Sequence, residues 1–421
     1  MTRLRLVTGE TFKSLSVRNF RLFFVGQGIS QIGNWLTLVA QTLLVLTLTK
    51  SGIALGVLAA AQFGPVLILG PWAGLVADRS DKRKLLMTVQ TIAMFQSFAL
   101  ATLAFIGNPP VLAVYGVALI GGLTVAFDNP ARRSFVVEMV PTDDMTNAVS
   151  LNSALMTSSR VIGPALAGLL VTTVGFGWAF LLDGLSYIAV LISLFMIRSN
   201  ELNAAPVTPK AKGQVRAGLR YARSVPDLWV PLVMMAIVGT LSFNFQVVFP
   251  LVVTRDFGGN DASFTILLSV VSVGSLIGAL AAARRKAVSI RWVALTALIF
   301  GAALTLMAFA PSMWAAYPIG LFVGLGSIAF MTASTAIMQI RSDPQMRGRV
   351  LALQAMVFLG STPIGGPIVG WIAEEFGARW SVGVGAVGAL GAGLWGLSVA
   401  RRTARDAVGS AAADPDLLAA A

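Results

Sequence analysis

Twelve apolar stretches follow one another along this chain, with little sequence between them. A helix needs about 20 apolar residues to cross the roughly 30 Å hydrocarbon core of a bilayer, and backbone polar groups in lipid must be paired within the structure. The pattern therefore predicts an all-α integral membrane protein with twelve transmembrane helices. The expected spans are residues 22–48, 53–77, 85–107, 110–128, 147–174, 177–197, 229–253, 262–283, 290–310, 312–338, 349–373 and 379–400.

Charge is distributed unevenly between the two sides of these spans. The chain has 31 Lys and Arg against 18 Asp and Glu, a balance that in a soluble protein would favour nucleic-acid binding. Here 27 of the 31 cations fall in the two tails and in the loops on the same side, which fits the positive-inside rule. We therefore expect a multi-pass plasma (inner) membrane protein with both termini in the cytoplasm, in contact with membrane lipids and not with nucleic acid.

The chain has no Cys and no His. This excludes disulfides, thiolate nucleophiles, imidazole bases and the usual zinc ligands. We expect no metal and no cofactor, and any proton chemistry has to use Asp or Glu. A monomer is expected.

One long polar linker divides the spans into two sets of six. The expected organisation is an N-terminal tail (1–21), a first six-helix half (22–197), a linker that includes a basic amphipathic helix (198–228), a second half (229–400) and a C-terminal tail (401–421). Cations three or four residues apart in the linker favour a helix lying at the lipid headgroups.

Corresponding glycine-proline pairs indicate that the two halves are repeats. Gly163-Pro164 precedes Gly168 in the fifth span, and Gly366-Pro367 precedes Gly370 in the eleventh. Because Gly and Pro are common in membrane helices, chance is the alternative, but matching order and flanking charge favour duplication. Such residues permit close packing and a kink where the halves meet.

A charged loop between the second and third spans carries the most specific motif. It contains Gly74, Asp78, Arg79, Lys82 and Arg83, whereas an ordinary cytoplasmic loop needs the cations but neither the glycine nor the aspartate. These five residues resemble the gating motif of the major facilitator superfamily, except that Asp81 stands in place of a second glycine. The resemblance implies two pseudo-symmetric six-helix halves that rock about a central site.

Other segments narrow the resemblance. Asn19-Phe20-Arg21, Leu48-Thr49-Lys50-Ser51-Gly52 and Phe180-Leu181-Leu182-Asp183 are similar to the exporter branch typified by enterobactin and macrolide efflux proteins. The pair Gly163-Pro164 with Gly168 resembles the antiporter motif of the superfamily. The resemblance implies a proton-driven exporter of a small molecule.

Amide side chains recur at helical spacing in the first span, at Gln27, Gln31, Asn34 and Gln41. Amides facing lipid would be costly, so this face should meet protein or water. In the superfamily the first, fourth, seventh and tenth spans line a central cavity, which the stripe fits; hydrogen bonding between helices is the alternative. The same spans supply further substrate-binding candidates: Trp35, Tyr115, Asn244, Gln246, Thr332, Thr335 and Gln339. With nearby Phe and Met residues they would suit a bulky, mostly apolar solute.

Ionisable residues inside spans are candidates for proton coupling, and the sequence offers Asp128, Asp183 and Arg160. A carboxylate in a dry site can alternate between protonated and ionised as a cavity opens to either side. The alternatives are structural: Asp128 would anchor a turn at Arg132 and Arg133, and Arg160 would be a fixed cation paired with backbone carbonyls.

The favoured function is thus proton-coupled efflux of small amphiphilic molecules, siderophore-like or drug-like, by alternating access. Proton-symport uptake in the same fold is one alternative. A membrane-embedded enzyme or lipid scramblase is another, disfavoured because no span holds a cluster of His, Cys or acidic residues. ATP-driven transport is disfavoured because the chain lacks the Gly-x-x-x-x-Gly-Lys-Ser/Thr phosphate-binding loop.

Overall fold

The computed structural model describes residues 12–203, 214–283 and 288–413, and within these ranges it contains helices and no strand. Twelve helices in the described ranges are long and apolar enough to cross a membrane, which confirms the predicted all-α membrane fold. The spanning helices of the N-terminal bundle are α2 (Arg18–Thr49), α3 (Gly52–Arg79), α4 (Lys82–Phe105), α5 (Val111–Glu138), α6 (Met145–Val174) and α7 (Phe176–Met196). Those of the C-terminal bundle are α9 (Pro226–Ser242) with α10 (Phe245–Leu251), α11 (Asp261–Ala283), α12 (Ile290–Ala308), α13 (Met313–Arg341), α14 (Pro344–Glu375) and α15 (Ala378–Ala413).

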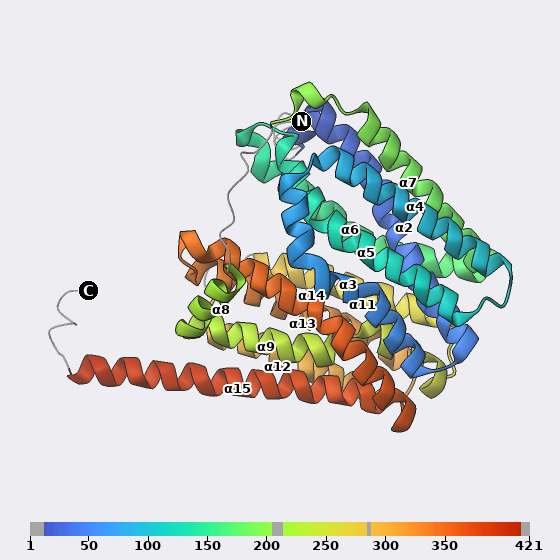
Figure 1. Ribbon diagram of the computed structural model, residues 1–421. Helices are drawn as coiled ribbons and strands as arrows, with labels where there is room; N and C mark the ends of the chain where they lie inside the picture. Colours follow the sequence, from blue (N-terminus) through green and yellow to red (C-terminus); the bar gives the residue numbers. More distant parts are fainter. Residues whose placement is uncertain (1–11, 204–213, 284–287, 414–421) are drawn as a thin grey trace, which may run out of the picture.

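The two bundles lie side by side (Figure 1) and meet mainly through two helix pairs, α3 with α14 and α6 with α11. Small residues make the first contact close, because a Cβ on Gly56 would lie 2.7 Å from the Cα of Pro367. A Cβ on Gly168 would overlap Thr265 of α11. The glycine-proline segments of both halves therefore lie where the bundles touch, and glycine permits the approach.

These contacts lie toward one end of the molecule. We call it the far end, where α2 ends and α3 begins; at the opposite, terminal end α2 begins and α15 ends. At the far end the Arg255 guanidinium donates to the Glu374 carboxylate (2.8 Å) and to the carbonyl oxygen of Lys50 (2.6 Å). At the terminal end, by contrast, a Cβ on Gly70, Gly74 or Gly348 would have no neighbour within 4 Å. Figure 1 shows α3 and α14 diverging toward this end.

A substitution at Gly370 tests how much the close contact between α3 and α14 contributes to stability. A Cβ there would overlap the backbone carbonyl of Gly52, which cannot rotate away. Gly370→Val should therefore reduce stability by about 1–3 kcal/mol, measured as a lower midpoint of thermal unfolding in detergent. Gly383→Val is the matched control, because nothing lies within 4 Å of a Cβ at Gly383. Equal losses in both variants would contradict a close-packed seam.

Three elements differ from the predicted spans. The fourth continues past Asp128 to Glu138 with Pro130 inside the helix, so the turn expected at Arg132 and Arg133 does not exist. The seventh span is broken at Phe243 and Asn244, and a π-helical turn, η4 (Val252–Asp256), follows α10. Pro250 within α10 also removes one backbone donor from that region.

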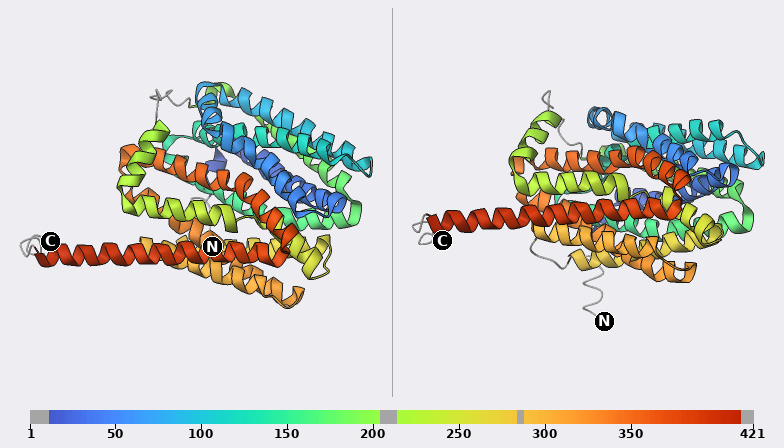
Figure 2. Two further views of the ribbon diagram at one scale, coloured as in Figure 1. Left: turned by 60° about the horizontal axis from the view of Figure 1, so that its bottom comes forward. Right: turned by 90° about the horizontal axis from the view of Figure 1, so that it is seen from below.

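The last helix, α15, runs to Ala413 and projects beyond the rest of the bundle (Figure 2), although the last span was expected to end at residue 400. Its last part is rich in Ala and Arg, which are strong helix formers. The remaining tail (414–421) lies outside the described residues, as do residues 1–11 of the N-terminal tail, 204–213 of the linker and the 284–287 loop.

The described part of the linker forms α8 (Gln214–Ser224), which packs on the start of α14. The Tyr221 hydroxyl accepts a hydrogen bond from the Asp343 backbone N–H at 3.0 Å. A Cβ on Gly218 would meet Arg349 and Leu353 at 3.2 Å. The helix expected at the membrane surface thus also contacts the C-terminal bundle.

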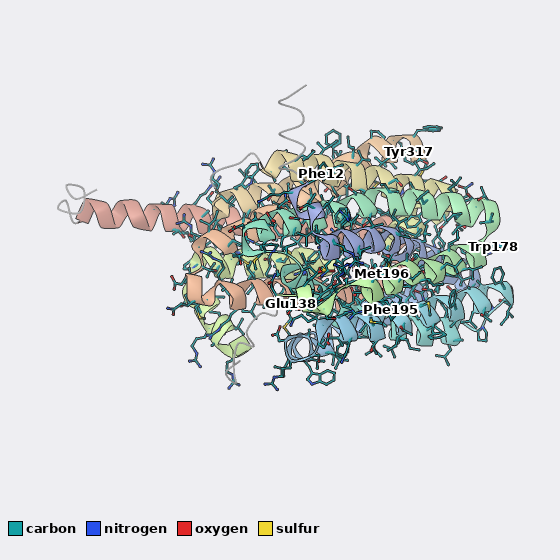
Figure 3. The ribbon with its side chains drawn as sticks, turned by 90° about the horizontal axis from the view of Figure 1, so that it is seen from above. Phe12, Glu138, Trp178, Phe195, Met196 and Tyr317 are labelled. Carbon is teal, nitrogen blue, oxygen red and sulfur yellow. The ribbon has the colours of Figure 1, made fainter. Side chains whose placement is uncertain are left out.

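Four of the exposed tryptophans lie at the far end. Trp178, Trp314, Trp371 and Trp380 lie at the far ends of α7, α13, α14 and α15, and each is at least 49% exposed. Figure 3 shows Trp178 at the opposite end of the bundle from Glu138. Tryptophan is enriched where membrane meets water, so these side chains are typical of one edge of the hydrocarbon layer.

Candidate functional site

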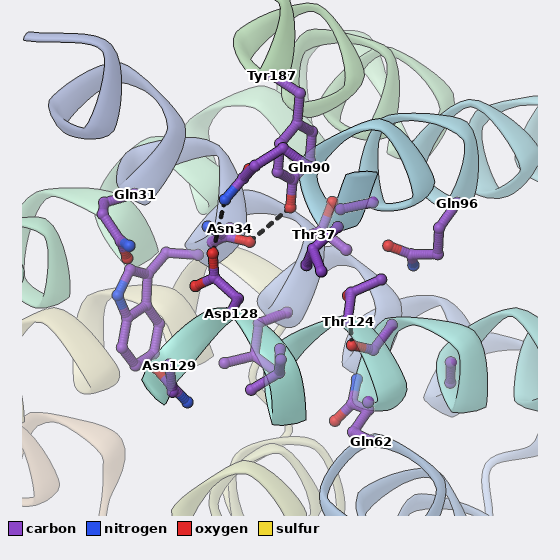
Figure 4. A pocket seen from close by; sticks show the side chains of 18 of the residues that line it. Gln31, Asn34, Thr37, Gln62, Gln90, Gln96, Thr124, Asp128, Asn129 and Tyr187 are labelled. Atoms are coloured by element: carbon purple, nitrogen blue, oxygen red, sulfur yellow. Dashed lines mark hydrogen bonds between the residues drawn. The ribbon is translucent and has the colours of Figure 1, made fainter. Parts of the chain in front are cut away.

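A cavity of about 230 Å³ lies within the N-terminal bundle (Figure 4). All six helices of that bundle contribute to its wall, α6 through Met156 and Arg160 and α7 through Tyr187. Amides and hydroxyls dominate the polar lining, beside apolar side chains such as Trp35 and Phe63. The polar groups are Gln31, Asn34, Thr37, Gln41, Gln62, Gln90, Gln96, Thr124, Asn129 and Tyr187. A mixed wall of this kind can bind a solute with both apolar and hydrogen-bonding parts.

An ion pair crosses one part of the cavity wall. Asp128 and Arg132 are one turn apart on α5, and the guanidinium donates to the carboxylate. Gln90 of α4 donates to the other carboxylate oxygen at 2.7 Å, and Arg132 also donates to Gln27 of α2 at 3.3 Å. Both charged side chains are buried. The pair therefore ties three helices together, which is the structural role that a buried, hydrogen-bonded ion pair can fill.

Asp183 of α7 lies behind the cavity wall and is fully buried. Its carboxylate accepts hydrogen bonds from Thr37 of α2 at 2.6 Å and from Ser97 of α4 at 2.7 Å. Ser186 approaches the second oxygen at 3.4 Å. No cation pairs with Asp183 in the part of the chain that the structure describes. Thr37 also lines the cavity, so the hydroxyl of Thr37 links this acid to the cavity wall.

Arg160 of α6 is one of the residues that line the cavity, and it is exposed. Across the described residues its guanidinium has neither an ion-pair partner nor a hydrogen bond, so the expected pairing with backbone carbonyls is not seen. The site therefore combines a paired arginine, Arg132, with an unpaired one.

The first-span stripe divides between cavity and packing. Gln31, Asn34, Trp35 and Gln41 line the cavity, whereas Gln27 lies beside Arg132. Asn34 accepts a hydrogen bond from the Tyr187 hydroxyl at 2.7 Å (Figure 4), and Gln41 accepts one from Gln62 at 2.8 Å. Both expectations for the stripe, solute access and bonding between helices, therefore describe part of it.

The remaining substrate-binding candidates lie away from this cavity. Tyr115 donates to the Ala54 carbonyl, and Gln354 donates to Thr335 at 2.7 Å. Thr332 is half-buried and Gln339 is exposed near the end of α13. Asn244 and Gln246 sit at the break in the seventh span, where the adjoining pocket holds only about 10 Å³. That is about enough room for one water molecule.

The aromatic residues near this break pack on one another instead of opening a second cavity. Phe243 lies 5.2 Å from Phe300 and 5.3 Å from Phe358 between ring centroids, and Phe245 stacks on Phe249 at 5.0 Å. Phe249 and Phe330 are fully buried.

The charged loop at the terminal end forms a compact turn. Asp81, which replaces a glycine of the motif, caps α4 by accepting from the Lys84 N–H at 3.1 Å, and its φ of −60° requires no glycine. Lys82 forms an ion pair with Glu138 at 2.7 Å, and Arg83 donates to the last carbonyls of α7. Asp78 is half-buried and Arg79 is exposed. Among the described residues, nothing lies within 4 Å of a Cβ built on Gly74, so no helix packs closely against it in this conformation.

Sequence reasoning missed several residues of the site. Gln62, Gln90 and Gln96 are glutamines inside the second and third spans, and their cost in lipid could have marked them. Arg132 was assigned to a loop because the span was ended at Asp128. Tyr187, one of four tyrosines in the chain, was also missed.

Comparison with known proteins gives a consistent result. The family model described as transmembrane secretion effector matches residues 9–420. The chain is 24% identical to the staphyloferrin A transporter of Staphylococcus aureus, over 85% of this chain and 90% of that protein. It is also 24% identical to macrolide efflux protein A of Streptococcus pyogenes, over 86% and 90%.

A solved structure shares the fold. It is a bacterial homolog of the human lysosomal transporter Spinster, in an inward-facing and unoccupied conformation. The match has a TM-score of 0.73 and 16% identity, and covers 92% of this chain and 97% of that one.

Proposed function

The chain belongs to the transmembrane secretion effector family of the major facilitator superfamily, and from that premise we propose that it exports small amphiphilic molecules, siderophore-like or drug-like, by proton-coupled alternating access. Its curated relatives and structural neighbours are transporters, so it is a multi-pass membrane transporter and not an enzyme. What we propose beyond this is the class of substrate, the direction of transport and the coupling ion.

The observation that carries the proposal is the cavity of about 230 Å³ with a mixed polar and apolar lining. An amphiphilic solute could place apolar surface against Trp35 and Phe63 and hydrogen bonds against the amides. The direction is supported by a relative that is named as a macrolide efflux protein. Uptake by symport in the same fold is the competing function.

Alternating access is supported by the way the bundles meet. Contacts such as that between Arg255 and Lys50 close the far end, while Gly74 and Gly348 lack neighbours at the terminal end. A rocking motion would exchange these two arrangements, and Gly74 and Gly348 would then gain partners. We place the protein in an inner membrane as a monomer, with its terminal end facing the cytoplasm. Lys82, Arg83 and Lys84 would then lie near anionic lipids.

Solute accumulation in cells tests the export function. In a host lacking its own major efflux pumps, expression of the chain should lower the steady-state content of at least one of three compounds: radiolabelled erythromycin, a ferric siderophore and a lipophilic dye. An uncoupler should abolish the difference, because collapse of the proton gradient removes the driving force. Increased content would indicate uptake, and efflux that persists with the uncoupler would exclude proton coupling.

A further inference from the structure

Arg160 is an uncompensated charge near the middle of a membrane-spanning helix. It lines the cavity, is exposed, and has no ion pair or hydrogen bond to any residue in the described ranges. Ionisable residues within spans are costly and are kept where they serve a function or find a partner. We therefore expect the charge of Arg160 to be balanced by a group that does not belong to the described residues.

The net charge of the cavity lining indicates the sign of the charge on that partner. Three ionised side chains line it, Asp128, Arg132 and Arg160, and the first two neutralise each other. Tyr187 also faces the cavity, with its hydroxyl bonded to Asn34. Asp183 lies behind the wall and is satisfied by hydroxyl groups. The lining of the cavity therefore carries a surplus positive charge, which favours an anion.

The surroundings of Arg160 indicate what else the ligand carries. Gly163, less than one turn further along α6, lies so close to Trp35 that a side chain there would overlap it. Both Trp35 and Arg160 line the cavity. Met156, one turn earlier, contacts Arg132 at 3.7 Å, so the two arginines face neighbouring parts of the space. An anionic group at the guanidinium would thus have an indole and amides within the same cavity.

We propose that Arg160 is a substrate-binding residue that recognises a carboxylate or comparable anionic group, so that the transported solute is an amphiphilic organic anion. This rests on the proposed function, because it names the solute class of the same cavity. The planar guanidinium can donate two parallel hydrogen bonds to a carboxylate, and such charge-assisted bonds are stronger than neutral ones.

Two dyes with one ring system and opposite charge provide the test: anionic fluorescein and cationic rhodamine 123. Binding is measured by fluorescence polarisation on the full chain in phosphatidylcholine nanodiscs. Wild type should bind fluorescein about tenfold or more tightly than rhodamine 123. Arg160→Gln should lower fluorescein affinity by about tenfold or more and leave rhodamine 123 affinity equal or higher. Arg160→Lys should retain part of the preference, and Arg133→Gln, an exposed arginine outside the cavity, should retain all of it.

Four results would overturn the inference: no fluorescein binding by wild type, no preference between the dyes, an unchanged fluorescein affinity in Arg160→Gln, or an equal loss of both dyes in that variant. The last would assign Arg160 to structure. Competition by phosphatidylglycerol added to the nanodisc would assign the anion site to a lipid headgroup. If wild type exports solutes in the accumulation assay without preferring the anionic dye, the exporter function stands and only this inference fails.

Discussion

Replacing Asp128 by Asn is expected to destabilise the protein by about 3–5 kcal/mol, the usual cost of removing one partner from a buried ion pair. Asp128 and Arg132 are 7% and 8% exposed, and the carboxylate is the only acidic partner of this guanidinium among the residues that the structure describes. In Asp128→Asn the cation would keep only weak contacts to Gln27 and Met156. The midpoint of thermal unfolding in detergent, followed by tryptophan fluorescence, should therefore fall.

A double variant distinguishes loss of the pair from loss of the aspartate itself. Asp128→Asn combined with Arg132→Gln removes both charges and should recover most of the lost stability, because no uncompensated ion remains. Asp81→Asn serves as the matched control. It removes a carboxylate from an exposed helix cap where Asn is an equally good residue, so little change is expected. If the double variant is as unstable as the single one, the ion pair is not what holds α5 to its neighbours.

The sequence was most informative where physical chemistry leaves few choices. Twelve spans followed from the length of apolar runs, because a membrane helix must pair its own backbone and cover about 30 Å. The fourth span was ended ten residues early, at Asp128, because its charges resemble a loop. Burial in the bundle lets Asp128 and Arg132 compensate each other one turn apart, which no window of hydropathy can detect.

The candidate site was predicted less completely, because it depends on contacts between distant segments. Helical spacing placed Gln31, Asn34 and Gln41 on one face, which requires only a single helix, and all three line the cavity. It could not show that Asn34 faces Tyr187, 153 residues away, or that Asn244 would sit beside a pocket of about 10 Å³. Periodicity identifies a face of a helix, and only packing decides what that face meets.

The largest functional effect is expected at Asp183, where Asp183→Asn should reduce uphill export about 5- to 150-fold, the range of typical coupling energies. The carboxylate is fully buried and bonded to Thr37 and Ser97. Hydroxyl groups can donate to an ionised carboxylate or accept from a protonated one, so the site can accommodate both states. Asparagine is neutral at every pH and mimics only the protonated state.

A variant that keeps the shape of this site but cannot exchange its proton should separate coupling from transport. In proteoliposomes, Asp183→Asn should lose export driven by an imposed pH gradient yet retain exchange of labelled for unlabelled solute, since the cavity lining is unchanged. Ser97→Ala, which removes one donor and leaves the acid, should lose much less. Gradient-driven export at the wild-type rate in Asp183→Asn would show that this acid only joins α2, α4 and α7. The coupling role would then pass to Asp128, whose ion pair with Arg132 would have to open during each transport cycle.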